Sequence, residues 1–403
     1  MCAILAVNDD NLRKALEQFL RSHGSPGVVV TSLEELSGGA SCRVYRFEID
    51  SGPPALVLRL DRQGGGVDGT RRDEHALLDA ARRAGVTVPA VHQLGAETDG
   101  LGGAFFVMDL VPGEALARRL LRDDRYAGAR RALPAQLGRE LARLHAIDAG
   151  QPSLSFLAAR APGGDDPRRF ALAEIERYRQ ILDVMSADQP YPLLRLAARW
   201  LEQSAPEVRR PALVHGDFRI GNVMFDETGL TAVLDWELSH VGDPIEDLGW
   251  LCVRTWRFGN DSLAAGGLCS REELLGHYER SGGAAGAWSA LAWWELFGNW
   301  KWAIICRMQA ARHTAGKWPD VELAAIGRRV AGPSERALRC RTNRQPSIFS
   351  KRSPPFCARK SLRVWTEACG SRQSSVRMWP ESSRARSRSL RRTTGPSFAV
   401  LSR

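Results

Sequence analysis

Lysine is nearly absent from this chain of 403 residues. It occurs only at Lys14, Lys301, Lys317, Lys351 and Lys360, so 51 of the 56 basic residues are arginine. A Walker A loop, G-x-x-x-x-G-K-[ST], needs a lysine followed by Ser or Thr. No lysine lies between Lys14 and Lys301, and the Gly-Lys pair at Lys317 is followed by Trp318. The sequence therefore excludes a nucleotide site of the Walker A type.

Long apolar runs and paired cysteines are also missing. No stretch of about 18 residues is both apolar and uncharged, as a transmembrane helix requires. Segment 1–7 lacks a preceding basic region and is too short for a secretory signal. The eight cysteines form no C-x-x-C pair, which argues against a zinc site. Scattered thiols are typical of a reducing compartment, so we expect a cytoplasmic protein without membrane attachment.

The net charge of +10 is distributed unevenly along the chain. Residues 332–403 hold 17 basic residues against three glutamates and no aspartate, a net charge of +14. Residues 1–331 hold 39 basic and 43 acidic residues, a net charge of −4. The basic total therefore predicts no nucleic-acid partner for the main body, and only the tail would attract one.

The tail, residues 332–403, lacks the apolar periodicity of a folded domain. Its 72 residues include 14 Ser and 15 Arg, too polar a mixture to bury a core alone. It nevertheless contains Trp and Cys, which evolved disordered segments usually lack. Two interpretations stay open: a basic arm for nucleic acid or an anionic membrane, and an out-of-frame read-through behind a domain that ends near residue 331. We favour the second.

The rest of the chain divides into a β-rich first part and a helical second part. Apolar spacing predicts helices over 11–22 and 72–84, with strands over 55–60, 86–91 and 104–108. Further helices are predicted over 133–145, 170–183, 193–203, 271–280 and 288–313. We expect two lobes, residues 1–110 covering a nucleotide and residues 111–331 carrying the catalytic loop and the substrate site.

Segment 213–237 is the one whose residues suggest chemistry. Residues 223–225 and 230–234 read as two strands joined by a turn, so Asn222 and Asp235 meet at the open end of a hairpin. Asp217 lies five residues before Asn222 in the preceding loop. Amide and carboxylate oxygens suit Mg²⁺, and a neighbouring free carboxylate can accept the proton of a hydroxyl. The pattern indicates phosphoryl transfer.

The same segment resembles a known family. The run His215-Gly-Asp217-x-x-x-x-Asn222, followed by Asp235-Trp-Glu, is similar to the kinase loop H-R-D-x-x-x-x-N and D-F-G. With Gly-Asp-Pro-Ile-Glu-Asp-Leu at 242–248, it resembles the aminoglycoside phosphotransferase family. Trp-Trp-Glu-Leu-Phe-Gly-Asn at 293–299 is similar to the subgroup of kinase-like domains joined to acyl-CoA dehydrogenases.

This resemblance covers residues 36–330 and implies an α+β, two-lobed protein-kinase-like fold. The N-lobe would be small and β-rich, and the C-lobe larger and mainly helical. The resemblance assigns Asp217 as the catalytic base or hydroxyl-orienting residue, and Asn222 and Asp235 as Mg²⁺ ligands. His215 belongs to the same catalytic loop, where we favour a bracing role over proton transfer. Asp243 and Asp247 are expected to hold the loop or to cap the next helix.

In the first lobe the resemblance implies a nucleotide site. Ser41, in the turn Ser-Gly-Gly-Ala-Ser, would face the nucleotide phosphates. Arg59 stands where kinases have lysine and would pair with phosphate oxygens, oriented by Glu74. Met108 and Leu110 fall where the inter-lobe hinge presents backbone groups to adenine. The alternatives are a surface arginine, a solvated glutamate and hinge side chains that only pack.

These features together imply an ATP- and Mg²⁺-dependent phosphotransferase that moves the γ-phosphate to a hydroxyl of a small molecule. Two acceptor classes stay open, a hydroxylated acyl thioester and an aminoglycoside-like molecule. Five tryptophans between positions 288 and 302 are expected in the core; any that line the site would suit an apolar acceptor. The alternative function is a catalytically weak, nucleotide-binding protein like a pseudokinase.

Overall fold

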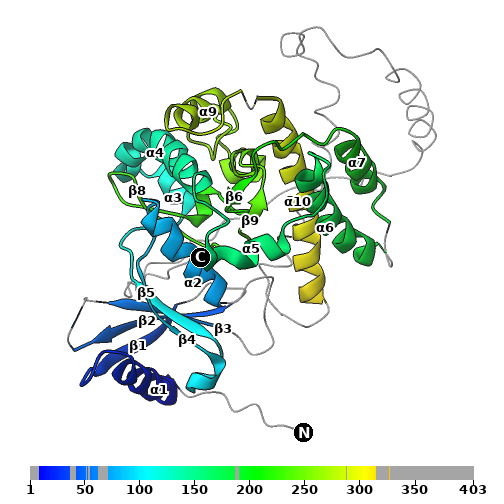
Figure 1. The fold of residues 1–403 in the computed structure, drawn as a ribbon. Coiled ribbons are helices and arrows are strands. Elements are labelled where there is room, and N and C mark those ends of the chain that lie inside the picture. The colour runs from blue at the N-terminus through cyan, green and yellow to red at the C-terminus, as the bar shows by residue number, and fades with distance from the viewer. Residues whose placement is uncertain are drawn as a thin grey trace, which may run out of the picture. The chain divides into compact units, whose positions relative to one another are not determined.

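The computed structural model describes residues 9–36, 42–50, 52, 55–61, 71–186, 190–286, 288–314 and 326 (Figure 1). Two sequence predictions lie outside these residues: the position of Ser41 and the tail 332–403. The prediction for the tail therefore stays a prediction.

The first part of the chain forms a five-stranded antiparallel sheet. Its strand order is β1 (Val30–Leu36), β2 (Cys42–Ile49), β3 (Leu56–Asp61), β5 (Phe105–Asp109) and β4 (Val91–Gly95). The strands predicted over 55–60 and 104–108 are confirmed, each shifted by one residue. The strand predicted over 86–91 is wrong, because β4 begins only at Val91. Pro89 lies just before it and has no backbone N–H to donate to a ladder.

Side-chain alternation along β3 determines which residues reach each face of the sheet. Leu58 and its alternate neighbours pack in one buried cluster with α1 (Asp9–Ser22). Val57 packs on the opposite face in the cluster that includes Leu77 of α2 (Arg71–Arg83). Because successive residues point to opposite faces, Arg59 shares the α2 face with Val57. A cation in an otherwise apolar strand is thereby directed toward α2.

The second part is mainly helical, as predicted. Its helices are α3 (Ala117–Arg122), α4 (Ala127–His145), α5 (Ser155–Arg160), α6 (Arg169–Met185), α7 (Pro192–Gln203), α8 (Ile245–Leu251), α9 (Arg271–Arg280) and α10 (Trp288–Thr314). All five helices predicted from periodicity are present, and α4 begins six residues before its predicted start. The α+β arrangement, with a β-rich N-terminal part and a helical C-terminal part, is confirmed.

Two short antiparallel ladders lie within the helical part. One pairs β6 (Ala212–Val214) with β9 (His240–Gly242), and the other pairs β7 (Val223–Phe225) with β8 (Leu230–Val233). The second is the predicted hairpin. Its turn closes on Asp226, whose Oδ1 accepts hydrogen bonds from the backbone N–H groups two and three residues later, at 2.7 and 3.1 Å. This local bonding is the reason an Asp stands at the turn.

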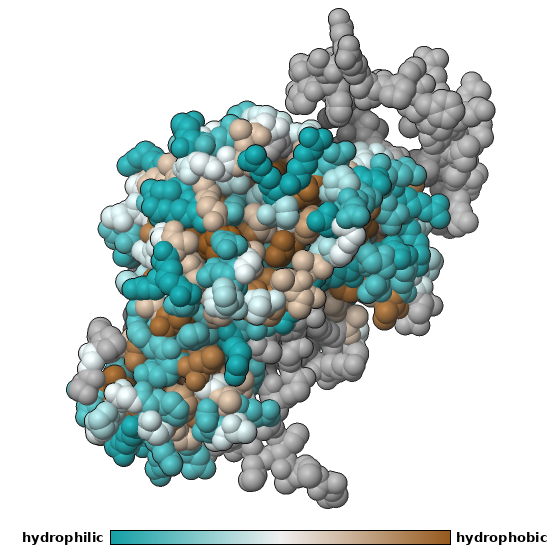
Figure 2. Space-filling model, viewed as in Figure 1, coloured by the Kyte–Doolittle hydropathy of each residue, from teal (hydrophilic) through white to brown (hydrophobic). Residues whose placement is uncertain are grey.

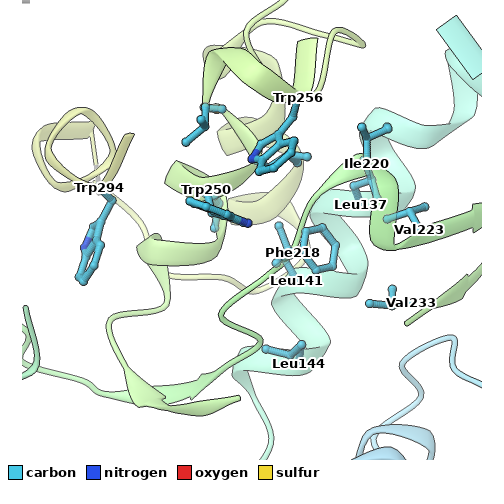
Figure 3. Close-up of a cluster of buried hydrophobic side chains, with 14 of the residues drawn as sticks. Leu137, Leu141, Leu144, Phe218, Ile220, Val223, Val233, Trp250, Trp256 and Trp294 are labelled. Atoms are coloured by element: carbon cyan, nitrogen blue, oxygen red, sulfur yellow. The ribbon is translucent and has the colours of Figure 1, made fainter. Parts of the chain in front are cut away.

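The core of the helical part anchors the segment between β6 and β7. Phe218 and Ile220 are buried in one cluster with Leu141 of α4 and Trp250 of α8 (Figure 3). Burying an aromatic side chain of this size contributes about 1.5–3 kcal/mol. The residues between and beside these two apolar anchors are consequently held in place by the core.

The tryptophans of α10 are mostly core residues, as expected. Trp293, Trp294 and Trp300 are at most 5% exposed, and Trp302 packs partly buried against the same cluster. Trp288, at the start of the helix, is 43% exposed. A helix that is apolar on nearly all sides is typically buried in a core.

The described surface is largely hydrophilic. On the face shown in Figure 2, hydrophilic side chains cover most of the area and apolar ones lie in small separate groups. None of the helices in the described ranges combines the length and the apolar character needed to cross a bilayer.

Candidate active site

The carboxylate of Asp217 is held by three donors. Trp250 Nε1 donates to its Oδ1 at 2.6 Å, and Asn222 Nδ2 donates to its Oδ2 at 2.7 Å. Arg219 Nε lies 3.2 Å from both oxygens. The side chain keeps 16% of its surface exposed, so it is not fully enclosed by the protein. The group therefore has a fixed orientation and access from outside.

The backbone before Asp217 is fixed by a buried carboxylate. The N–H groups of His215 and Gly216 donate to Asp247 Oδ2 and Oδ1 at 2.8 and 2.9 Å. His145 Nε2 donates to the same Asp247 at 3.1 Å. Burial raises the pKa of Asp247, but the bonds from His145 and the backbone outweigh burial and lower it. The expectation that Asp247 holds the loop is confirmed.

Asp243 has the other expected role. Its Oδ1 accepts the backbone N–H of Ile245 at 3.0 Å, at the start of α8. Its Oδ2 accepts the indole N–H of Trp294 at 2.7 Å. It caps the helix that carries Asp247 and ties that helix to α10.

His215 braces the loop through both ring nitrogens. Nδ1 accepts the backbone N–H of Asp217 at 3.2 Å, and Nε2 donates to the carbonyl of Leu234 at 3.0 Å. The residue is fully buried beside Trp236, with ring centroids 5.0 Å apart. Because both nitrogens are already bonded to backbone groups, the geometry favours bracing over proton transfer.

Gly216 occupies a position that only glycine fits. Its φ is +80°, and a Cβ there would lie 2.4 Å from the carbonyl oxygen of Leu238. Residues with a side chain pay for a left-handed conformation and would also clash at this position. This is the physical reason that the position of the kinase-loop arginine holds a glycine here.

Asn222 and Asp235 offer oxygen ligands at the end of the hairpin. The backbone N–H of Leu234 donates to the carbonyl of Asn222 at 2.9 Å, which places the two strand ends side by side. Asp235 has a φ of +69°, a left-handed conformation that costs about 1–2 kcal/mol outside glycine. The buried Trp236 next to it fixes the turn by donating to the carbonyl of Val233 at 3.2 Å. The side chain of this strained residue, Asp235, is 36% exposed.

This donor set fits a magnesium ion. Asn222 Nδ2 faces Asp217, so its Oδ1 points away and accepts no hydrogen bond from the residues that the structure describes. Asp235 adds an accessible carboxylate. Hard oxygen donors with open positions for phosphate oxygens and water are what Mg²⁺ requires.

Arg59 and Glu74 form the predicted ion pair. Arg59 Nη2 lies 3.0 Å from Glu74 Oε1 and 3.7 Å from Asp235 Oδ1, with side-chain exposures of 11% and 3% for Arg59 and Glu74. Burial lowers the pKa of Arg59, but Glu74 and Asp235 outweigh burial and raise it. Strand β3 thus places the charged guanidinium of Arg59 close to the carboxylate of Asp235.

The proposed hinge residues differ in their surroundings. Met108 is 8% exposed and pairs with Val57 and Val91 in the middle of the sheet. Leu110, two residues later, is 36% exposed. The side chain of Met108 therefore packs within the sheet, in line with the alternative that the hinge side chains only pack.

Four residues of the site were missed from the sequence. Arg71 pairs with Asp61 at 2.7 Å and also contacts Glu74. The others, which contact Asp217 or Gly216 in the loop between β6 and β7, are Arg219, Trp250 and Lys301. The scarcity of lysine was an available signal for Lys301, because a chain that avoids lysine keeps one in its most apolar helix.

A buried ionic cluster lies behind the loop. Single ligand atoms of Glu174, His240 and Glu246 lie within 4.8 Å of one another, a spacing that would suit a metal. Lys301 Nζ, however, lies 3.5 Å from Glu246 Oε1. Burial lowers the pKa of His240, but Glu174 and Glu246 outweigh burial and raise it to about 9. Two cations thus neutralise two carboxylates, and the charge balance favours an ion network over a metal site.

Known proteins and a known family match most of this chain. Residues 32–294 match the model of the phosphotransferase enzyme family, known as APH. Acyl-CoA dehydrogenase family member 10 of Mus musculus is 28% identical over 257 residues, 62% of this chain and 22% of that protein. Family member 11 of Pongo abelii is 27% identical over 305 residues, 70% of this chain and 37% of that protein. The chain thus spans well under half the length of these relatives.

Solved structures share the fold. A protein described as a candidate aminoglycoside phosphotransferase, from Ralstonia eutropha JMP134, has a TM-score of 0.64 at 24% identity, over 81% of this chain and 97% of that chain. Ethanolamine kinase of Plasmodium vivax has a TM-score of 0.56 at 13% identity, over 83% and 92%. A thermostable mutant of aminoglycoside phosphotransferase APH(4)-Ia, in complex with AMP-PNP and hygromycin B, has a TM-score of 0.50 at 22% identity, over 81% and 98%. The fold is protein-kinase-like, and the chain belongs to the phosphotransferase enzyme family.

Proposed function

We propose that this protein transfers the γ-phosphate of ATP to a hydroxyl group of a small molecule. The observation that carries the proposal is the convergence of Asp217, Asn222 and Asp235. Asp217 and Asn222 are in direct contact at 2.7 Å, and Asp235 follows the strand that pairs with the one after Asn222. A fixed, accessible carboxylate beside two oxygen ligands is the arrangement that phosphoryl transfer needs.

Each residue has a distinct part in the proposed reaction. Asp217 accepts a hydrogen bond from the acceptor hydroxyl, orients its oxygen and takes its proton. Asn222 Oδ1 and the Asp235 carboxylate hold Mg²⁺, which, when bound, neutralises phosphate charge. Arg59 pairs with phosphate oxygens, and Glu74 keeps its guanidinium in place. His215 fixes the backbone of Asp217.

We propose ATP as the phosphate donor, held mainly by residues 1–110. The solved structure of APH(4)-Ia with AMP-PNP supports an adenine nucleotide in this fold. Backbone groups between Met108 and Leu110 would receive the adenine, and Ser41 would cover the phosphates. Residues 111–331 would supply the catalytic loop and the acceptor site.

Arg219 bears on the acceptor. Its Nε contacts Asp217, and its guanidinium carbon lies 4.8 Å from the ring centroid of Trp256. Within the described ranges its terminal nitrogens donate to no side chain or carbonyl, so they are available to a ligand. A guanidinium beside the base repels a polycation and attracts an anionic or neutral polar group. We therefore favour a hydroxylated acyl thioester over an aminoglycoside-like acceptor.

The names of the relatives point the same way. They are called acyl-CoA dehydrogenase family members, so acyl thioesters belong to the chemistry for which they are named. The partly buried Trp302 lies 4.8 Å from Trp256, ring centroid to ring centroid, so a second aromatic ring lies beside the one that Arg219 contacts. No membrane or nucleic-acid partner forms part of this proposal.

The test is ADP release from Mg·ATP with candidate acceptors. We expect hydroxyacyl thioesters to accelerate ADP release by wild-type protein at least tenfold over water, and an aminoglycoside not to do so. Asp217→Asn should lose at least about 100-fold of the stimulated rate, the scale of general-base catalysis. The matched control is Asp79→Asn, at an aspartate of α2 whose side chain is 44% exposed and pairs with Arg83.

Two outcomes would contradict the proposal in different ways. If Asp217→Asn turns over as fast as wild type, the assignment of the base is wrong. If wild type binds Mg·ATP but no hydroxylated molecule accelerates ADP release, the pseudokinase-like alternative is the better description.

A further inference from the structure

Lys301 is a buried lysine whose ammonium reaches the catalytic loop. It lies in α10 and is 2% exposed. Its Nζ donates to the carbonyl oxygen of Gly216 at 3.0 Å and lies 3.5 Å from Glu246 Oε1. A buried ammonium is costly unless it is paired and hydrogen-bonded, so these contacts account for its presence in an apolar helix.

The same ammonium touches a second support of the loop. Lys301 Nζ lies 4.7 Å from the ring centroid of Trp250, within the range of a cation–π interaction. Trp250 Nε1 donates to Asp217 Oδ1 at 2.6 Å, and Figure 3 shows the indole nitrogen facing the segment that carries Phe218. Lys301 therefore contacts both the peptide before Asp217 and the indole that holds its carboxylate.

The peptide contact completes a clamp on the loop. The N–H of Gly216 is bonded to Asp247, and its carbonyl to Lys301, so both polar groups of this residue are fixed. The left-handed conformation of Gly216 depends on such anchoring, because the open backbone of glycine has many alternatives. Without the ammonium, the peptide that leads into Asp217 would lose the partner of its carbonyl.

We propose that Lys301 is a positioning residue: its ammonium holds the Gly216 carbonyl and the Trp250 ring so that the Asp217 carboxylate faces the acceptor hydroxyl. The consequence for catalysis rests on the proposed function. The geometric part, that Lys301 sets the Trp250–Asp217 hydrogen bond, does not. Among the described residues, the contacts of Lys301 include none of the residues proposed to hold nucleotide or Mg²⁺, so we expect its loss to lower turnover and to leave nucleotide binding intact.

The geometric part is tested by the indole ¹H–¹⁵N resonance of Trp250. The resonance is assigned by its loss in Trp250→Phe, and the position without a carboxylate partner is taken from Asp217→Asn. We expect Lys301→Met to move the resonance at least half of the way from the wild-type position toward the Asp217→Asn position. Lys14→Met, the same change at a lysine that is 66% exposed, should leave it in place.

The catalytic part is tested by steady-state ADP release from Mg·ATP. For Lys301→Met we expect kcat to fall at least tenfold while the KM for ATP stays within twofold of wild type. A role in folding alone would lower the melting temperature and leave kcat of the folded protein unchanged. Lys14→Met should retain both constants.

A second variant covers poor folding of Lys301→Met. Glu246→Gln with Lys301→Met removes both members of the pair, so that no buried carboxylate is left without its cation. An unmoved Trp250 resonance in either folded variant overturns the proposal, as does an unchanged kcat with wild-type turnover present. If wild type releases no ADP, the proposed function fails, and the Trp250 resonance still decides on Lys301.

Discussion

At the scale of single residues, the site depends on backbone conformations that most side chains avoid. Gly216 and Asp235, on either side of the hairpin of the candidate site, have φ values of +80° and +69°. Glycine adopts this conformation freely, whereas at Asp235 it is a strain, and such strain persists where surrounding contacts determine it and concentrates at functional sites. Here the contacts are known: Asp247 and Lys301 hold Gly216, and the buried Trp236 holds Asp235.

Gly216→Ala tests the close approach of the loop to Leu238. The left-handed conformation costs about 1–2 kcal/mol for alanine, and a clash at 2.4 Å adds to it. Gly85→Ala is the matched control, because Gly85 has a φ of +79° and no atom within 4 Å of a built Cβ. We expect urea unfolding to show a loss at Gly216 exceeding that at Gly85 by about 2 kcal/mol, the scale of overpacking. Equal losses would mean that the loop yields without cost.

Residue types and spacing made part of the site predictable. Asp217 and Asn222 are five residues apart on one loop, and a two-strand hairpin brings Asp235 to them, so local rules suffice. Trp250 and Lys301 could not be found this way. They reach the loop from 33 and 85 residues away in sequence, and no local rule fixes such contacts.

At the scale of elements, four segments meet in the ionic cluster behind the loop. Glu174 comes from α6, His240 from β9, Glu246 from α8 and Lys301 from α10. The cluster ties three helices and a strand to the carbonyl of Gly216. The charge state of this cluster therefore contributes to the stability of the whole helical part.

The cluster predicts a loss of stability at alkaline pH. In the folded protein the pKa of His240 is about 9, above the ordinary histidine value of 6.5. The contribution of protonated His240 to the free energy of unfolding is therefore fully present below about pH 6.5. It is lost as the pH rises through 9, an effect on the order of 3 kcal/mol. We expect urea unfolding of wild type to show this decline, and His240→Gln to lack it.

The control is His92→Gln at an exposed histidine of β4, which should decline with pH as wild type does. A flat stability profile of wild type between pH 6.5 and 9 would contradict a protonated His240.

Element prediction succeeded where periodicity was long and failed where backbone chemistry intervened. The ten-residue helix α9 was predicted at its observed bounds, and β4 was predicted too early because Val86 to Val91 reads as apolar and β-branched. Pro89 interrupts that run, and the ladder forms only after it. The direction of α10 was not predictable, because apolar residues on all its sides define no single face.

At the scale of the whole molecule, the chain combines a mildly acidic main part, residues 1–331, with a strongly basic tail. Residues 1–331 carry a net charge of −4, and residues 332–403 carry +14. The family match ends at residue 294, before the tail begins. The proposed nucleotide chemistry is therefore assigned to residues 1–331 alone.

Deleting residues 332–403 should leave Mg·ATP binding and ADP release within twofold of the full chain. The same deletion should abolish any salt-dependent binding to DNA, because the excess positive charge is gone. DNA binding is measured by fluorescence anisotropy between about 50 and 200 mM salt, the range over which contacts between basic residues and phosphates weaken strongly. Loss of ADP release on deletion would show that the tail belongs to the enzyme.

The measurement that tests the central claim most directly is thermal stability with and without Mg·ATP. A ligand at about 100 times its Kd stabilises the native state by about 2.7 kcal/mol. We predict an increase in melting temperature that requires Mg²⁺ in wild type, is lost in Asp235→Ala and is retained in Asp79→Asn. An unchanged melting temperature in well-folded wild type, or an undiminished increase in Asp235→Ala, would contradict the account.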